Sequence, residues 1–199
     1  TGDLEIADSL TMSGQGHFLF PATGPKRSVS INRNINCIPD GTSDVNYIEV
    51  ENGVSAESDH ELYLYGDIRI GDSRMTFWHA SDKRKVDLYF PGDSSATVFD
   101  ANPDNTFNIQ LDQIIVNKTS GSELAFREEF NLNGSTDGNE KALVLNSGKF
   151  ASYNANTNLT LTSGGADFIV PQGSELMVKF GTAKITGDNT GILLDGQLT

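Results

Sequence analysis

The chain has 199 residues, of which 37% are hydrophobic and 21% charged, so it can bury a core as one large domain or two small ones. Lys and Arg number 14 against 27 Asp and Glu, which gives a formal net charge of −13. Nucleic acids and anionic membranes both select proteins with clustered basic side chains. No apolar stretch approaches the roughly 20 residues that span a bilayer. We therefore expect neither nucleic-acid binding nor membrane insertion.

The chain opens with "TGDLEIADSL", which contains no Met, no basic segment and no apolar segment. This opening indicates a chain that begins inside a longer or processed protein, with any export signal outside it. Cys37 is the only cysteine, which excludes an intrachain disulfide and a C-x-x-C metal site. Its position between Ile35 and Ile38 predicts a small core residue.

Candidate strands follow one another from residue 45 to residue 194. Most alternate between apolar and polar residues, or are rich in β-branched and aromatic residues, and Gly, Asn, Asp or Pro bounds nearly all of them. They span residues 45–50, 62–70, 75–79, 86–90, 96–99, 107–116, 124–132, 142–146, 158–162, 167–170, 175–180 and 191–194. The best helix candidate is 122–130, but Leu124, Phe126 and Phe130 all occupy even positions, which favours a strand. The pattern predicts an all-β chain.

The regularity of these strands differs along the chain. Residues 1–85 are less regular and include the aromatic side chains Tyr63, Tyr65 and Trp78, whereas residues 86–199 are more repetitive. We expect both parts to belong to a single domain spanning residues 1–199. The aromatic residues have two interpretations: they are core residues, or they face solvent as a platform on which sugar rings stack. In the second interpretation Trp78, Tyr63 and Tyr65 are the candidate ligand-binding residues.

The stretch "DANPDN" resembles a calcium-binding loop. Asp100, Asn102 and Asp104 occupy positions 1, 3 and 5, where this hard cation takes oxygen ligands. Asn105 stands where such a loop has glycine, and no Glu occupies position 12, so a polar turn containing Pro103 is the alternative. Ca²⁺ held by Asp100, Asn102 and Asp104 is the only cofactor that the sequence suggests.

A short unit recurs in the second half of the chain: two apolar residues separated by one residue, then one or two residues, then glycine. It appears as "FNLNG", "LVLNSG", "LTLTSG", "LMVKFG" and "ILLDG", which end at Gly134, Gly148, Gly164, Gly181 and Gly196 and so recur at similar but unequal intervals. We expect the apolar members of the unit to be buried and stacked in register. These residues are Leu143, Leu145, Leu159, Leu161, Leu176, Val178, Ile192 and Leu194.

Two architectures fit a loose repeat of strands without helices. In a β-solenoid each unit stacks on the previous one, and glycine and asparagine occupy the corners. In an antiparallel β-sandwich the units are the arms of hairpins. Asn and Thr residues that can stack with their own kind, such as Asn154, Asn156 and Thr160, favour the solenoid.

From residue 107 onward the sequence has a recognisable style. The run "IIVNKTSG", residues 114–121, followed by the units that end at Gly134, Gly148 and Gly164, resembles the repeat regions of large surface proteins and adhesins of gliding and gut bacteria that use type IX secretion. The resemblance covers about residues 86–199. It implies an extracellular or cell-surface, right-handed parallel β-helix that acts as a stalk or adhesive segment and depends on the secretion machinery of its parent protein.

The sequence contains no catalytic constellation that we recognise. There is no G-x-S-x-G and no H-E-x-x-H motif, and most of the acidic residues stand singly at turns. Parallel β-helices also include polysaccharide lyases and hydrolases, and Arg69 and Arg74 are the candidates for a substrate-carboxylate clamp of that kind. We predict that the chain is not an enzyme. Because its basic residues are spread along the sequence, we expect neutral glycans or other surface proteins as partners.

Overall fold

A computed structural model describes residues 3–21, 24–38, 45–50, 60–71, 74–76, 86–100, 109–111, 113–128, 130–132, 142–155, 157–162, 167–185 and 191–199. Within these ranges all regular elements are β-strands, which confirms the predicted all-β class. The same ranges contain no helix that is long and apolar enough to cross a membrane.

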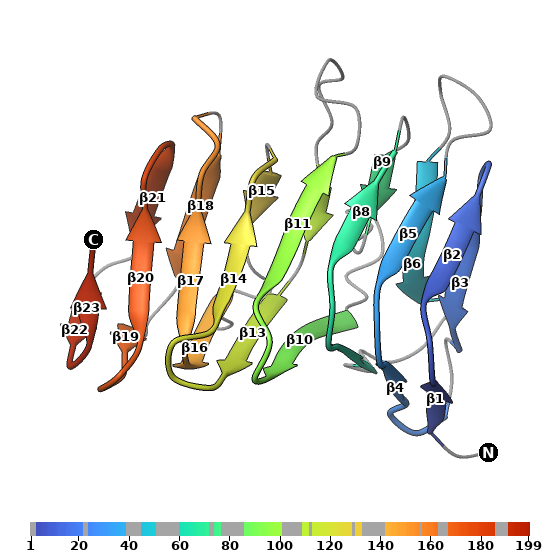
Figure 1. Ribbon diagram of the computed structural model, residues 1–199, viewed down its shortest axis with the longest axis horizontal. Coiled ribbons are helices and arrows are strands. Elements are labelled where there is room, and N and C mark those ends of the chain that lie inside the picture. The colour runs from blue at the N-terminus through green and yellow to red at the C-terminus, as the bar shows by residue number, and fades with distance from the viewer. Residues whose placement is uncertain are drawn as a thin grey trace.

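The described strands form three long sheets and one short one. The lower sheet contains β1 (Leu4–Ile6), β4 (Ser28–Ile31), β7 (His60–Leu64), β10 (Val86–Gly92), β13 (Gln113–Lys118) and β16 (Leu143–Ser147). The front sheet contains β2 (Leu10–Ser13), β5 (Ile35–Ile38), β8 (Ile68–Ile70), β11 (Ala96–Asp100), β14 (Glu123–Phe126), β17 (Lys149–Ser152), β20 (Glu175–Val178) and β23 (Gln197–Leu198). The rear sheet contains β3 (His17–Phe20), β6 (Val45–Val50), β9 (Arg74–Thr76), β12 (Ile109–Leu111), β15 (Phe130–Leu132), β18 (Asn158–Thr162) and β21 (Thr182–Ile185). The short sheet pairs β19 (Phe168–Val170) with β22 (Ile192–Leu194) and continues the position of the lower sheet (Figure 1).

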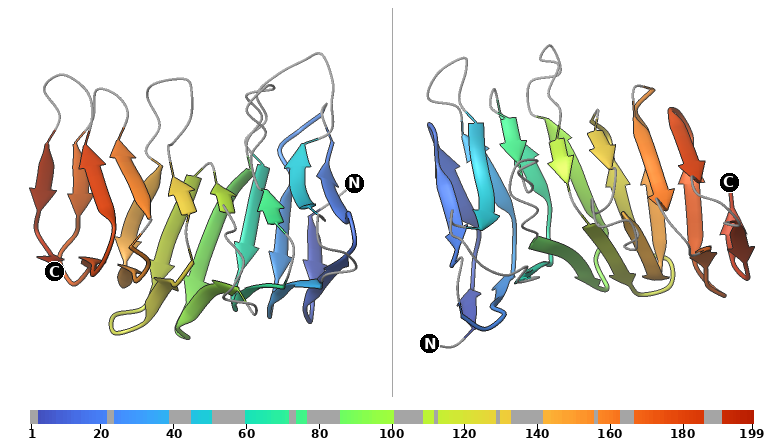
Figure 2. Two further views of the ribbon diagram at one scale, coloured as in Figure 1. Left: turned by 90° about the horizontal axis from the view of Figure 1, so that it is seen from above. Right: turned by 180° about the vertical axis from the view of Figure 1, so that it is seen from behind.

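The sheets are the three sides of a parallel β-solenoid. Consecutive strands belong to different sheets, and each strand pairs in parallel with the strand one turn away, as β7 pairs with β4 and β10. As the chain advances from right to left in Figure 1, it rises along the front sheet and descends along the rear sheet, which makes the path right-handed (Figures 1 and 2). The predicted parallel solenoid is therefore confirmed, and the antiparallel sandwich is wrong.

The core is a narrow column of apolar side chains that point inward from all three sheets. In the lower sheet Leu62 pairs with Val29 of the preceding turn and with Leu88 of the following turn, and all three are buried. In the front sheet Cys37 stacks between Met12 and Ile70. Burial raises the pKa of the Cys37 thiol to about 12, so this cysteine is the small core residue that the sequence predicts.

The length of one turn differs from the repeat that the sequence suggests. Glu123, Lys149 and Glu175 are register partners in three successive turns, and the two equal intervals between them are longer than any interval between the glycines of successive units. The shorter glycine units belong to different sheets: "FNLNG" contains β15 of the rear sheet, "LVLNSG" contains β16 of the lower sheet, and "LMVKFG" contains all of β20 of the front sheet except Glu175. The intervals between successive glycines therefore do not separate stacked positions.

The repeat unit predicted that its apolar residues are buried and stacked on one another. The burial is confirmed for the first members of the set, but the stacking is wrong. Leu143, Leu145, Leu159, Leu161 and Leu176 are buried, and Val178 is partly buried, but they come from three different sheets and meet across the core. Ile192 is 41% exposed and Leu194 is 49% exposed. Both lie in β22, which pairs with β19 and with no other described strand, so its inward side has no covering turn.

Corners of the solenoid also divide strands that the sequence presents as continuous. The predicted strand 62–70 is split into β7 and β8, 107–116 contains β12 and part of β13, and 124–132 contains parts of β14 and β15. Strands β1 to β5 lie in residues 4–38, where the sequence pattern predicts none. The three divided strands share one cause: a corner can be very short and is not always marked by glycine.

Gly148 marks a corner between the lower and front sheets where glycine is required. Its φ is +80°, in the left-handed region that side chains other than glycine rarely adopt. A Cβ at this position would lie 2.5 Å from the Cβ of Lys118 and 3.1 Å from the carbonyl oxygen of Ser122. Gly173 has a similar φ of +79° one turn further on, but a Cβ there would have no heavy atom within 4 Å.

Leu161→Asp should lower the free energy of unfolding by about 4 kcal/mol, because it places a charge without a partner in the narrow core. Thr160→Asp is the matched control, since Thr160 is the neighbouring residue of β18 and is only partly buried; its expected cost is about 0.5 kcal/mol. Chemical denaturation of both variants gives the two values. Equal costs would contradict the inward orientation of Leu161.

Gly148→Ala and Gly173→Ala separate steric clash from backbone strain. Gly173→Ala should cost about 1 kcal/mol, because only the left-handed backbone opposes the new methyl group. Gly148→Ala should cost about 2 kcal/mol more, because the methyl group also meets Lys118. Denaturant midpoints measured for the two variants test this order, and a larger loss at position 173 would contradict it.

Candidate binding face on the front sheet

Two of the three residues of the predicted aromatic platform lie on the outer face of the lower sheet. Tyr63 in β7 is partly buried and stacks on Tyr89 of the next turn, with ring centroids 4.6 Å apart and planes inclined by 20°. Tyr65 follows β7 and is 42% exposed. Trp78 lies outside the described residues. The two tyrosines are thus on the outside of the solenoid, and their role in ligand binding stays a prediction.

A carboxylate adjoins the tyrosine pair. Glu61 accepts hydrogen bonds from the Ser28 hydroxyl at 2.9 Å and from the Tyr89 hydroxyl at 3.3 Å, and Lys26 Nζ lies 2.7 Å from its Oε1 atom. Burial alone would raise the pKa of Glu61, but the contacts with Lys26, Ser28 and tyrosine hydroxyl groups outweigh it and hold the pKa below its usual value. Burial, together with the hydrogen bond and charge of Glu61, raises the pKa of Tyr63 to about 12.

The predicted calcium loop falls mostly outside the described part of the chain. Asp100 ends β11, but its side chain and the residues Asn102 and Asp104 lie outside that part. Among the side chains that the structure describes, no group of three or more His, Cys, Asp and Glu residues could hold a metal ion. Calcium binding at Asp100, Asn102 and Asp104 therefore stays a prediction.

The outer face of the front sheet carries a row of alternating basic and aromatic side chains, which we call the cation–aromatic row. Its members, in order along the solenoid, are Arg69, Phe99, Arg127, Tyr153 and Lys179. Each member lies one turn after the member before it. Phe99 is the register partner of Arg69. The backbone N–H groups of Arg127, Tyr153 and Lys179 each donate a hydrogen bond to the neighbouring strand of the preceding turn. Parallel pairing therefore places one side chain of the row about every 4.8 Å along the axis.

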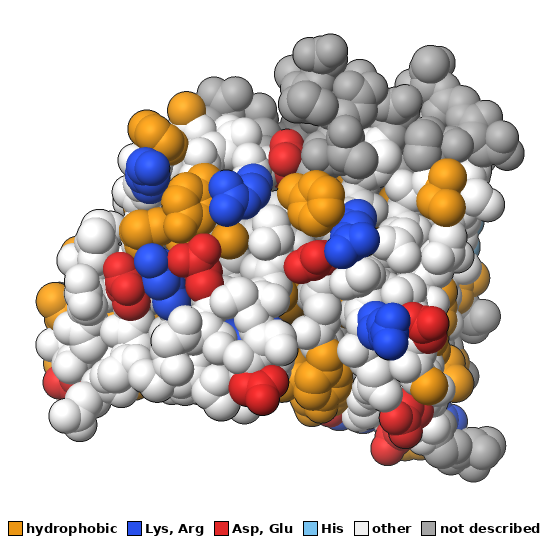
Figure 3. All heavy atoms as spheres, viewed as in Figure 1, with side chains coloured by type: hydrophobic (Ala, Val, Ile, Leu, Met, Phe, Trp, Pro, Cys, Tyr) orange, Lys and Arg blue, Asp and Glu red, His pale blue; other side chains and the backbone are white. Residues whose placement is uncertain are grey.

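The rings of this row are in contact with its cations. The guanidinium carbon of Arg69 lies 5.8 Å from the centroid of the Phe99 ring, and that of Arg127 lies 4.9 Å from the centroid of Tyr153. Lys179 Nζ lies over the Tyr153 ring at 5.8 Å. At these distances the negative face of an aromatic ring attracts a cation. In Figure 3 this part of the front face appears as a hydrophobic patch bordered by basic and acidic side chains.

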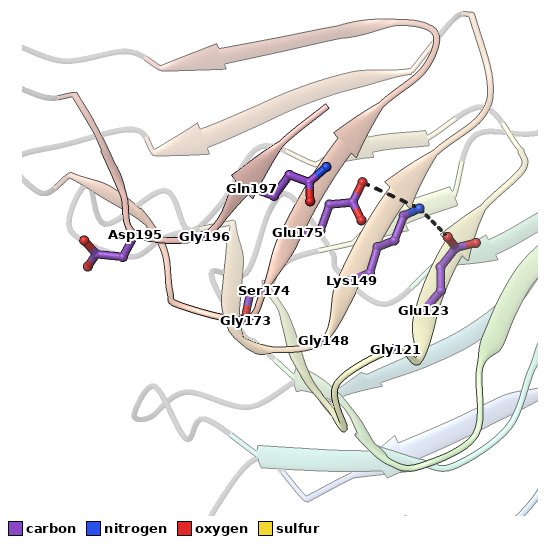
Figure 4. A pocket seen from close by; sticks show the side chains of 10 residues that line it. All are labelled: Gly121, Glu123, Gly148, Lys149, Gly173, Ser174, Glu175, Asp195, Gly196 and Gln197. Atoms are coloured by element: carbon purple, nitrogen blue, oxygen red, sulfur yellow. Dashed lines mark ion pairs between the residues drawn. The ribbon is translucent and has the colours of Figure 1, made fainter.

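A second row runs beside the first and is called the ion-pair row. It consists of Glu123, Lys149, Glu175 and Gln197, which are register partners in successive turns. Lys149 Nζ lies 3.1 Å from Glu123 Oε2 and 3.7 Å from Glu175 Oε1, and its side chain points between the two carboxylates (Figure 4). Burial alone would lower the pKa of Lys149, but the hydrogen bond to Glu123 and the two negative charges outweigh it and raise the pKa.

The ion-pair row borders a shallow groove. The groove has a volume of about 610 Å³ and is lined by the ion-pair row together with Gly121, Gly148, Gly173, Ser174, Asp195 and Gly196. Ala125, Ala151 and Met177 are register partners between the rows. The small alanine side chains leave room for Tyr153, whose hydroxyl lies 3.3 Å from both carboxylate oxygens of Glu123. The face thus offers cations and hydrogen-bond donors along a line, which suits recognition of an extended ligand.

Sequence reasoning missed most of this face. It singled out Arg69, but paired it with Arg74, which lies in β9 of the rear sheet. Arg127, Tyr153 and Lys179 were not identified, although they have the same spacing along the chain as Glu123, Lys149 and Glu175. A search for residues at that spacing would have found these three members of each row, but not Arg69, Phe99 or Gln197, which are separated from their neighbours by other intervals.

No protein-family model, no curated protein and no solved structure matches the chain.

Glu61→Gln should lower the free energy of unfolding by about 1 kcal/mol at pH 7, because it weakens charge-assisted contacts with Lys26 and Ser28. The folded-state pKa of Glu61 is depressed, so this stability is present above the ordinary pKa of about 4.3 and is lost as the pH falls through the folded value. Denaturation curves of wild type and variant should therefore converge as the pH falls below the ordinary pKa of the carboxyl group. Glu5→Gln, at an exposed position where glutamine can still accept the hydrogen bond from Asn32, controls for the change in net charge. A Glu61→Gln cost that is independent of pH would contradict this assignment.

Proposed function

We propose that the chain is an extracellular or cell-surface β-solenoid segment with a structural and adhesive role, and that the outer face of its front sheet binds a glycan or another surface molecule. The observation that carries the proposal is the cation–aromatic row. Its five side chains follow one line across successive strands, and Arg69, Arg127 and Lys179 are exposed. A line of this kind favours an extended ligand over a compact one.

The proposed location at the cell surface is supported by the sequence. The resemblance of residues 86–199 to repeat regions of type IX-secreted surface proteins supports export by the machinery of a parent protein and display at the cell surface. The parallel solenoid is the architecture that this resemblance implies, and a rigid stack of turns suits a stalk.

The ionisable groups of the front face support a role in binding and not in catalysis. A carboxylate that acts as a general acid or base has to reach the reacting group of a substrate. Glu123 and Glu175 are both engaged by Lys149, and Glu123 also contacts the Tyr153 hydroxyl. Arg69 is engaged by Asp67, with Nη2 and Oδ2 3.1 Å apart. We therefore propose that the segment holds its ligand and does not transform it.

The purified chain should bind members of a glycan array, and Tyr153→Ala should weaken that binding roughly fivefold to tenfold through loss of the central ring of the row. Tyr47→Ala is the matched control, because Tyr47 is a partly buried tyrosine of the rear sheet that stacks on His17 at 4.6 Å. It should leave binding unchanged. Thermal melting of each variant verifies that it is folded.

Three results would contradict the proposal. Loss of binding in Tyr63→Ala, Tyr65→Ala or Trp78→Ala, but not in Tyr153→Ala, would move the site to the residues that the sequence singled out. Release of reducing or unsaturated sugar ends from a bound polysaccharide would establish the β-helix lyase or hydrolase alternative. Binding to neither glycans nor surface proteins would leave a purely structural segment.

A further inference from the structure

The basic side chains of the front face fall into two groups. Arg69 is paired with Asp67, and Lys149 is held between Glu123 and Glu175. Arg127 and Lys179 contact aromatic rings, and neither forms an ion pair with any residue that the structure describes. The positive charge of these two side chains is therefore not neutralised on the surface itself.

Arg127 and Lys179 flank one tyrosine. The Tyr153 N–H donates to Phe126 O at 2.8 Å, and the Lys179 N–H donates to Ser152 O at 3.0 Å, so Arg127, Tyr153 and Lys179 occupy the same position in three successive turns. Two strand steps separate the cations, which corresponds to about 9.6 Å between their backbones. We call this arrangement the cation seat.

The net charge of −13 by itself favours a neutral or basic ligand, but the charges around the cation seat favour an acidic one. Charges farther apart than about 8 Å are largely screened at physiological ionic strength, so the local balance governs a contact at the surface. The neighbouring carboxylates of Asp67, Glu123 and Glu175 share the cations of Arg69 and Lys149, so Arg127 and Lys179 bring this part of the face to four positive charges against three negative ones. An anionic group that docks on the seat therefore meets two cations that have no competing carboxylate in contact among the described residues.

The seat is also poorly suited to a neutral sugar. Neutral sugars bind aromatic residues by stacking on the ring face, but Arg127 and Lys179 both lie over the Tyr153 ring. A sugar that stacked there would have to displace them. A carboxylate or sulfate would instead accept hydrogen bonds from the guanidinium and ammonium groups and leave their contacts with the ring in place.

We infer that the cation seat binds an acidic glycan, through a carboxylate or sulfate group that lies across Arg127, Tyr153 and Lys179. The inference rests on the proposed glycan-binding role of the front face and specifies its ligand class. A polysaccharide fits the row because the row presents one side chain per turn along a line, and an extended acidic polysaccharide carries its charged groups at regular intervals along its length.

The test uses the full chain and polymers that differ only in charge. Polygalacturonate and its fully methyl-esterified form share one backbone, and dextran sulfate and dextran share another. The chain should bind the acidic member of at least one pair and not the neutral member, and that pair identifies carboxylate or sulfate as the recognised group. Binding should weaken steeply as salt is added, because surface charges are screened.

Arg127→Gln and Lys179→Gln should each weaken binding about tenfold or more, the effect of losing a charge-assisted hydrogen bond. Arg33→Gln is the matched control, because it changes the net charge equally. Arg33 is exposed at a corner near the N-terminal end of the solenoid, where its Nε atom lies 3.5 Å from Asp8 Oδ1. This variant should bind as the wild type does. Equal effects of all three substitutions would show a response to net charge and overturn the seat.

The remaining outcomes separate this inference from the function on which it rests. Equal binding of methyl-esterified and free polygalacturonate would overturn the acidic specificity but leave a glycan-binding face. Binding of poly-L-glutamate as tight as that of the acidic glycans, with the same dependence on Arg127 and Lys179, would identify the ligand as an acidic peptide and overturn the glycan. Failure to bind any of the polymers, together with a negative glycan array, would overturn both proposals.

Discussion

Parallel pairing between equivalent strands of successive turns is the constraint on which the rest of this structure depends. Each inner strand of a sheet is hydrogen-bonded on both sides, to the strand one turn before it and the strand one turn after it. Pairing fixes the register, so a side chain stacks on the side chain at the same position of the neighbouring turn. Leu62, Leu88 and Ile114 form such a column in the lower sheet. Inward columns of this kind become the core, and outward ones become rows on the surface.

The same constraint explains the polar groups at the corners. Where the chain passes from the lower to the front sheet, side chains supply hydrogen bonds that the sheet ladders do not. Asn34 Oδ1 accepts from the Asp67 N–H at 2.9 Å, and Lys118 Nζ donates to Pro91 O at 2.9 Å. Lys118 is almost fully buried, and burial lowers its pKa, although the negative charges of Asp67 and Asp93 partly oppose this effect. A buried lysine with a carbonyl partner is thus part of the corner itself.

Stacking also converts a weak sequence signal into a surface with a defined character. A residue type that recurs once per turn is diluted along the sequence but becomes continuous on the face. Basic residues look dispersed in a chain that carries 14 of them among 199 residues, yet Arg69, Arg127, Lys149 and Lys179 lie on one sheet. The sequence argument for a neutral ligand assumed that such residues stay apart. On the front sheet that assumption fails, which is why we infer an acidic ligand.

The sequence by itself determined the all-β class, the burial of residues such as Leu159 and Leu161, and the core position of Cys37, and it favoured the stacked architecture over the sandwich. These properties depend on local alternation and on the general advantage of burying apolar side chains, both of which are visible in a short window. The tertiary structure alone decided the length of a turn, the division of strands at corners, and therefore which residues are neighbours. An apolar-x-apolar unit followed by glycine looks the same in the sequence whichever of the three sheets it belongs to. Successive units therefore look like one repeat, although they lie in different sheets and do not pair with one another. Arg127 and Tyr153 are neighbours only because backbone hydrogen bonds align β14 with β17, and no local pattern contains that alignment.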